Sequence, residues 1–195
     1  MDKEKRRKET GCAGDLRRER KMADIDGLLL GALHHEAGHP RRSGHILKVA
    51  ALAGTIGREE GLEEEEQMIL EAAAVLHDIG IKSCKEKYGE ADQEKLKAES
   101  AQVARQMLED SGYPKAWVDK ILHLIQMHHD YEHIDSQAYQ ILVEADLWVC
   151  ALEESWDREK IRALQQGAQA QPIPQARHET ARGRVVEVAA GVHGD

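Results

Sequence analysis

Apolar residues recur at helical spacing along most of the chain, and they predict a series of amphipathic helices. The first runs over 23–38, with Asp24 placed to cap its start and the Gly-His-Pro sequence at 38–40 to end it. The other predicted helices are one that carries His45 and ends at Gly61, then 63–76, 93–109, 114–128, 136–153 and a short one at 157–166. The polar segment 83–92 contains a turn and is expected to form one rim of a pocket.

Two of the apolar stripes contain an ionisable residue, which is costly to bury unless a hydrogen-bonding or oppositely charged partner lies beside it. His45 precedes the apolar residues Val49 and Leu52 by 4 and 7 positions, which places it on the buried side of its helix. Taken alone, such a histidine is typical of a core residue that a backbone carbonyl satisfies. Asp146 lies in the middle of the last strong stripe, where an ionised carboxylate costs several kcal/mol unless it is neutralised. A metal or an Arg/Lys partner is therefore required there.

Further imidazoles and carboxylates occur where helices end or face the core. His77 and Asp78 follow an alanine-rich apolar run, and such a pair suits Mn, Fe, Co, Ni or Zn better than Mg or Ca. In the next histidine pair, His128 continues the apolar face of its helix, whereas His129 lies nearer the edge. A structural role is the alternative for that pair. Glu99 is placed to lean toward the core side of its helix.

Composition favours one all-α domain. The chain has 195 residues, of which 41% are apolar, contains no Phe, and is rich in residues with high helix propensity. We therefore expect a compact multi-helix bundle over 23–166. A mobile charged arm is expected at 1–22, and a loosely attached or disordered tail at 167–195, because neither shows apolar periodicity.

Charge and cysteine usage exclude several classes. A net charge of -9 argues against a general nucleic-acid binder, although it leaves a local basic pocket open. No apolar run approaches the length of a membrane span, and no apolar segment follows the charged start, so we expect neither a membrane span nor a signal peptide. Cys12, Cys84 and Cys150 lie far apart without a C-x-x-C pair, which argues against disulfides and thiolate zinc sites and fits a reducing cytoplasm. The sequence leaves a homo-oligomer open.

The metal-competent residues fall into four motifs on different predicted helices. The motifs are R-x-x-H at 42–45, A-A-V-L-H-D-I-G at 73–80, I-Q-M-H-H at 125–129 and I-L-V-E-A-D at 141–146. In this order they resemble the HD-domain superfamily of metal-dependent phosphohydrolases, and most closely its small bacterial stand-alone members. The resemblance spans about 23–166, excludes the arm and the tail, and implies an all-α HD-domain bundle.

The resemblance also implies a divalent transition metal, Mn, Fe, Co, Ni or Zn, as one or two ions. The implied ligands of the first ion are His45, His77, Asp78 and Asp146, with Asp78 available to bridge to a second ion. The candidates for holding a second ion are Glu99, His128 and His129. The candidates for binding a phosphate group are Arg42, Lys48 and Lys82, of which the arginine is the better bidentate donor. The candidates for direct roles in catalysis are Asp78, His128 and Lys82.

The implied function is hydrolysis of a small phosphorylated molecule, a nucleotide among the candidates, by attack of metal-bound hydroxide on phosphorus. Ile81 stands where the deoxynucleotide monophosphatases have the acid of H-D-x-x-E, and the H-D-x-x-E-D of alarmone hydrolases is also absent. The cyclic-dinucleotide branch has a lysine in the place of Ile81 and a Gly-Tyr-Pro after its histidine pair, whereas here that tripeptide lies at 112–114, before the pair. The alternative function is a non-catalytic HD module that binds metal or nucleotide as a sensor.

Overall fold

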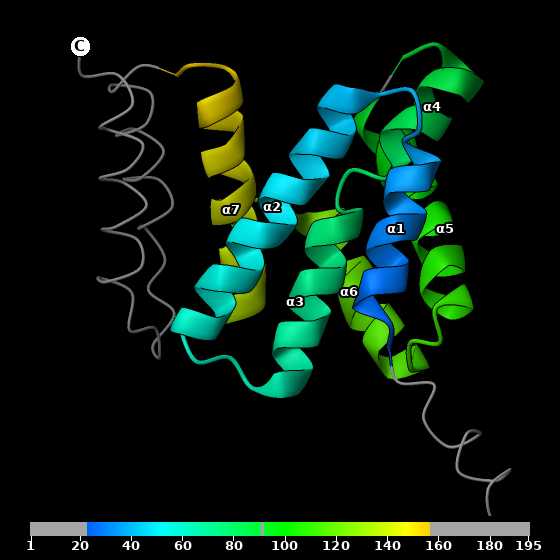
Figure 1. Ribbon diagram of the computed structural model, residues 1–195. Helices are drawn as coiled ribbons and strands as arrows, with labels where there is room; N and C mark the ends of the chain where they lie inside the picture. Colours follow the sequence, from blue (N-terminus) through cyan, green and yellow to red (C-terminus); the bar gives the residue numbers. More distant parts are fainter. Residues whose placement is uncertain (1–22, 91, 157–195) are drawn as a thin grey trace, which may run out of the picture.

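The computed structural model describes residues 23–90 and 92–156, and this part of the chain is a helical bundle that contains no strand (Figure 1). Its seven helices are α1 (Ile25–His35), α2 (Pro40–Glu59), α3 (Glu64–Leu76), α4 (Gly80–Tyr88), α5 (Gln93–Asp110), α6 (Lys115–Met127) and α7 (Gln137–Glu153). The predicted all-α class is confirmed. The predicted arm at 1–22, the short helix at 157–166 and the tail at 167–195 lie outside the described residues.

Polar caps and prolines determine where the helices begin. The Asp24 side chain accepts a hydrogen bond from the backbone N–H of Gly27 at 2.9 Å, as the sequence predicted. Ser136 caps α7 in the same way through the N–H of Tyr139. Helix α1 ends at His35, earlier than the predicted residue 38, because α2 already begins at Pro40, whose ring is compatible with a first helical turn.

The polar segment that was expected to contain a turn also contains a helix. Residues 80–88 form α4, and only Gly80 and Cys84 of that helix are buried. With only these two residues buried, the segment has too little apolar content to indicate a helix, and the helix packs along α5. Gly89 ends α4 with a φ of 78°, a left-handed conformation that glycine adopts without strain. The chain therefore turns at Gly89, as predicted, and the helix that precedes this turn was not predicted from the sequence.

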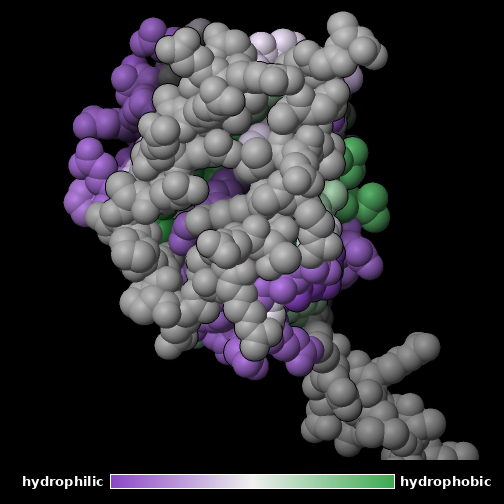
Figure 2. Space-filling view, turned by 90° about the vertical axis from the view of Figure 1, so that its left-hand side faces the viewer, coloured by the Kyte–Doolittle hydropathy of each residue, from purple (hydrophilic) through white to green (hydrophobic). Residues whose placement is uncertain are grey.

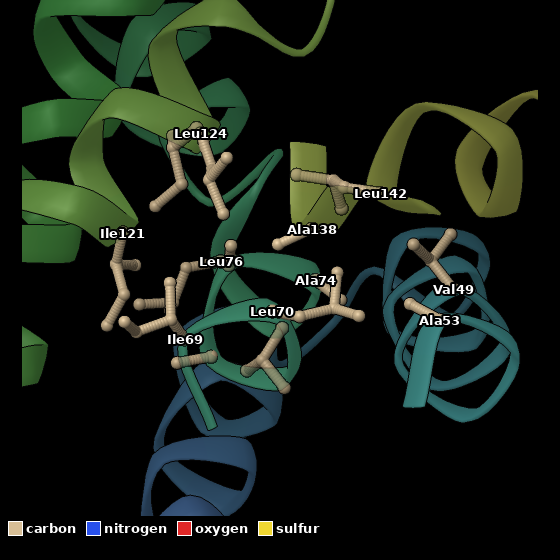
Figure 3. Packing of buried hydrophobic residues seen from close by; sticks show 14 of the residues in the cluster. Val49, Ala53, Ile69, Leu70, Ala74, Leu76, Ile121, Leu124, Ala138 and Leu142 are labelled. Carbon is tan, nitrogen blue, oxygen red and sulfur yellow. The ribbon is translucent and has the colours of Figure 1, made fainter. Parts of the chain in front are cut away.

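Helix α3 lies at the centre of the bundle. It packs against α1, α2, α6 and α7, and the close view in Figure 3 shows its side chains between those of α2, α6 and α7. Three consecutive alanines of α3, at 72–74, are fully buried, and their small side chains let neighbouring helices approach on several sides. The end of α3, where His77 and Asp78 follow, is thereby held in place by the core.

The outer surface of the described residues is mainly polar. Figure 2 shows hydrophilic side chains along much of the visible margin and a small hydrophobic group at the right edge. Among the described helices, none combines the length and the apolar character that crossing a membrane requires.

The close approach of α5 to the residues after Asp78 generates a first prediction. A Cβ added at Gly80 would meet the backbone of Ser100, with its Cα atom only 2.7 Å away. Gly80→Ala must therefore separate α4 from α5, and we expect it to lower the free energy of unfolding by roughly 1 to 3 kcal/mol in denaturant titrations.

Gly44→Ala is the matched control, because a Cβ at Gly44 meets no atom within 4 Å. This substitution lies inside α2, so it should leave stability unchanged or raise it by up to about 1 kcal/mol. Equal stability of the two variants would show that the α4–α5 approach does not depend on the glycine.

Candidate metal centre

Three side chains from three helices meet at the end of α3. His77 is the residue that ends α3, His45 lies in the second turn of α2, and Asp146 lies in the middle of α7. His45 Nε2 lies 3.2 Å from His77 Nε2 and 3.1 Å from Asp146 Oδ1. His77 Nε2 lies 3.7 Å from the same carboxylate oxygen. His77 and Asp146 are buried, as predicted for Asp146, and the side chain of His45 is 12% exposed.

These distances suit the ligands of a single ion. Two atoms that each lie about 2.1 Å from an ion are roughly 3 to 4.2 Å apart, depending on the angle between them. The three distances among His45, His77 and Asp146 fall within that range. Two imidazole nitrogens with a carboxylate oxygen form a set that divalent transition metals accept. The three residues therefore form a group that could hold such an ion.

A second group of potential ligands, Asp78, His128 and His129, lies beside the first. Asp78 Oδ2 lies 3.7 Å from His77 Nε2, and Asp78 Oδ1 lies 3.9 Å from His128 Nε2. Asp78 was predicted as a ligand of the first ion with the capacity to bridge, and the structure places its carboxylate between the two groups. His128 is buried and His129 is exposed, which confirms the predicted orientation of the pair.

The buried imidazole of His128 keeps one nitrogen free. Its Nε2 atom is buried and has no hydrogen-bond partner in the part of the chain that the structure describes. Burial, together with the neighbouring His77 and His129, lowers the pKa of His128 to about 4. The ring is therefore neutral near pH 7 and retains a lone pair on the side that faces Asp78, which is the form that binds metal.

Asp146 is ionised although it is buried. Burial alone would raise its pKa, but the hydrogen bond with His45 and the nearby His77 hold the pKa of Asp146 below its ordinary value. Burial acts against the charged form of His45, yet the hydrogen bond to Asp146 raises the pKa of this imidazole. The thiol of Cys150 donates to Asp146 Oδ1 at 3.6 Å, and burial with that negative charge raises the pKa of Cys150 to about 12. Cys150 is therefore an unreactive thiol.

The histidines are oriented through their Nδ1 atoms. His77 Nδ1 donates to the carbonyl of Ala74 at 2.9 Å, and His128 Nδ1 donates to that of Ile125 at 2.6 Å. His45 Nδ1 instead lies 3.2 Å from Glu153 Oε2. Sequence reasoning did not select Glu153. Its spacing of two helical turns after Asp146 was the available signal, since it puts both carboxylates on one face of α7.

Each of the three cations that were predicted to bind phosphate contacts an oxygen atom of the protein. Arg42 Nε lies 2.5 Å from Oε2 of the buried Glu36. Lys48 Nζ lies 2.8 Å from Oε1 of Glu153, and Lys82 Nζ donates to the carbonyl of His35 at 2.6 Å. The carbonyl of His35 is one of those that the end of α1 leaves without an intrahelical partner. The structure therefore gives these cations structural contacts that the sequence did not predict.

Glu99 is buried, as its helical position predicted, but it belongs to neither ligand group. Its carboxylate lies 2.6 Å from Lys87 Nζ and accepts a hydrogen bond from the Tyr88 hydroxyl at 3.3 Å. The expectation that Glu99 helps to hold a second ion is thus not supported by its contacts. The physical reason is α4, whose last turn supplies the cation that neutralises this buried acid.

Comparison with known families places this site in a recognised class. The family model of the HD domain matches residues 42–189, which is more than half of the chain. The chain therefore belongs to the HD-domain family, most of whose members are metal-dependent hydrolases. Comparison with curated proteins and with solved structures gave no match.

Hydrogen bonds from Tyr139 hold the turn that carries His128 and His129. The Tyr139 hydroxyl contacts the carbonyl of Met127 and, at 2.5 Å, that of Asp130. Tyr139→Phe leaves these carbonyls without the donor, so we expect unfolding to be easier by roughly 1 to 3 kcal/mol. Hydrogen exchange of the amides at 128–135 should also become faster than in the unaltered chain.

Tyr131→Phe is the control for this second prediction, because Tyr131 is exposed and follows the same turn. It should change neither stability nor exchange. If Tyr139→Phe behaves like this control, the tyrosine does not hold the turn, and the two histidines are positioned by the helix end alone.

Proposed function

We propose that this protein is a metal-dependent phosphohydrolase that acts on a small phosphorylated molecule. The observation that carries the proposal is the convergence of two ligand groups, His45 with His77 and Asp146, and Asp78 with His128 and His129. Membership of the HD-domain family supports the same function. Because Asp78 lies within 4 Å of a histidine of each group, we propose that it is shared between them.

The donor set also supports the class of ion. Imidazole nitrogens with carboxylate oxygens favour Mn, Fe, Co, Ni or Zn, and two adjacent groups give room for one or two ions. A divalent ion bound there would supply an activated water and neutralise phosphoryl oxygens. The protein residues would fix the positions of these charges, because their Nδ1 atoms are held by Ala74, Ile125 and Glu153.

We propose Arg42 as the residue that binds substrate phosphate. Its Nε atom is paired with Glu36, and the structure gives its two Nη atoms no other described partner. It lies one helical turn before His45, so its side chain emerges on the same side of α2. Lys48 and Lys82 are weaker candidates, since each would first have to leave its present acceptor. The substrate proposal extends to a nucleotide, with Ile81 arguing against the branches that need an acid there.

A second candidate function, a non-catalytic sensor of metal or nucleotide, is favoured by one observation. All three cations that were expected to bind phosphate already contact groups of the protein. A sensor only has to bind its ligand. A phosphohydrolase also needs cations that are available to stabilise the charge on the phosphoryl group in the transition state. Release of phosphate is the property that separates the two functions.

The test joins metal analysis to a phosphate-release screen over nucleotides and sugar phosphates. The unaltered chain should carry a transition metal and release phosphate, and Asp146→Ala should lose both, because it removes the most deeply buried carboxylate of the site. Its melting temperature should fall as well, since the remaining buried ligands are left uncompensated. Asp119→Ala is the matched control, because this acid is largely exposed and, among the described residues, pairs with Arg105 on the surface.

Three outcomes separate the alternatives. Metal and phosphate release that both depend on Asp146 support the phosphohydrolase. Metal without release of phosphate from any compound in the screen supports the sensor. An Asp146→Ala protein that is as metal-loaded as the unaltered chain would show that the proposed ligand set is wrong.

The two ligand groups should also be separable by mutation. His128 is paired with Asp78 and His129 and is not needed to complete the group around His45. We therefore expect His128→Ala to retain roughly one metal per chain while turnover falls on the order of 100-fold, the effect of removing a charge-stabilising group. Elemental analysis and steady-state kinetics measure the two quantities. Loss of all metal would place His128 among the ligands of the first ion, and an unchanged rate would make it purely structural.

A further inference from the structure

The three inward-facing histidines of the site, His45, His77 and His128, are oriented in two different ways. His77 and His128 each end a helix, α3 and α6, and each donates its Nδ1–H to the carbonyl three residues earlier. The last carbonyls of a helix have no intrahelical partner, so they are available to a histidine at that position. These two rings are therefore oriented by the backbone of their own helix.

His45 has no such acceptor. It lies in the second turn of α2, which runs from Pro40 to Glu59, so the carbonyls before it already accept bonds from backbone N–H groups of the same helix. The acceptor that its Nδ1 meets is Glu153, 3.2 Å away and 108 residues further along the chain. The orientation of His45 thus depends on a side chain from another helix.

Two side chains of α7 contact the His45 ring, one at each of its nitrogens. Asp146 Oδ1 lies 3.1 Å from Nε2, and Glu153 Oε2 lies 3.2 Å from Nδ1. The two acids are seven residues apart, which is two helical turns, so they occupy one face of α7. Lys48, one turn after His45 on α2, lies 2.8 Å from the other oxygen of Glu153.

We infer that Glu153 is a positioning residue for the metal site, which binds the Nδ1 side of His45 and thereby directs Nε2 toward the position of the ion. This inference rests on the proposed function. With its Nδ1–H bound to Glu153, the His45 ring turns Nε2 toward His77 and Asp146. That atom donates to Asp146 in the metal-free protein and would present its lone pair to an ion bound there. Outer partners of this kind fix the ring of a metal-binding histidine and increase its basicity. The end of α7 then belongs to the metal site although Glu153 contacts no ion itself.

Binding of Co²⁺ to metal-free protein tests the inference, with affinity measured by visible absorption against a competing chelator. Glu153→Ala lets the His45 ring rotate and lets either nitrogen carry the proton, so Co²⁺ should bind about 10- to 100-fold more weakly. Glu153→Gln keeps the size of the side chain without its charge. Its Co²⁺ affinity should lie between that of the unaltered chain and that of Glu153→Ala. Circular dichroism melts establish that each variant is folded.

Glu154→Ala is the matched control. Glu154 is the next residue of the chain, is exposed, and accepts a hydrogen bond from the Trp156 indole rather than from His45. Its removal changes the net charge by the same amount as Glu153→Ala does. Co²⁺ affinity should therefore be unchanged in this variant, and a loss equal to that of Glu153→Ala would show that only overall charge is involved.

A second measurement detects the tautomer itself. In Zn²⁺-loaded protein, proton–nitrogen correlation spectra should show His45 protonated at Nδ1 and bound through Nε2, and Glu153→Ala should lose this single state. A residue that merely stabilises the fold would leave the tautomer unchanged. Unaltered Co²⁺ affinity and an unaltered tautomer in Glu153→Ala would overturn the inference and leave the proposed function intact. An unaltered chain that binds no Co²⁺ would overturn both, and Co²⁺ binding without phosphate release would remove only the hydrolase function.

Discussion

An ionised carboxylate inside a helical core is the constraint on which this structure depends. Asp146 occupies a stripe of α7 that is otherwise apolar, and its negative charge is tolerated because His45 and His77 converge on it. Three helices must therefore keep a fixed relation to one another. The alanine-rich middle of α3 makes that relation possible, because its small side chains let α2 and α7 pack closely on either side of it.

Most of the fold could be predicted from the sequence, because helical periodicity is a local property. The burial of Asp146, the inward orientation of His128 and the outward orientation of His129 all follow from spacing within a single helix. Helix α4 was not predicted, since only two of its nine residues are buried and its apolar content is low, and it packs along α5. The helix ends were correct within a few residues, because capping residues and glycines are also local signals.

The sequence predicted which residues of the candidate site face inward. It did not predict which groups the surrounding side chains contact. Asp146 and His45 could be predicted because they are polar residues on apolar stripes, whereas the sequence does not show which groups Glu153 and Lys82 contact. Their partners, a histidine 108 residues away and the carbonyl at the end of α1, are known only once the helices are packed. Glu99 shows a different limit of the sequence. Its inward position was read correctly, but the cation that neutralises it comes from the helix that the sequence did not reveal.

Exposure across the site shows from which side a ligand would enter. The side chain of His77 is completely buried, that of Asp146 is 8% exposed, and that of Asp78 is 26% exposed. His129, in the second group, is exposed. Solvent therefore reaches the second group more readily than the first, and an incoming molecule meets the Asp78 and His129 end of the site before the group around Asp146. The first group is thus the better shielded of the two candidate ion positions, and the second is the more accessible one.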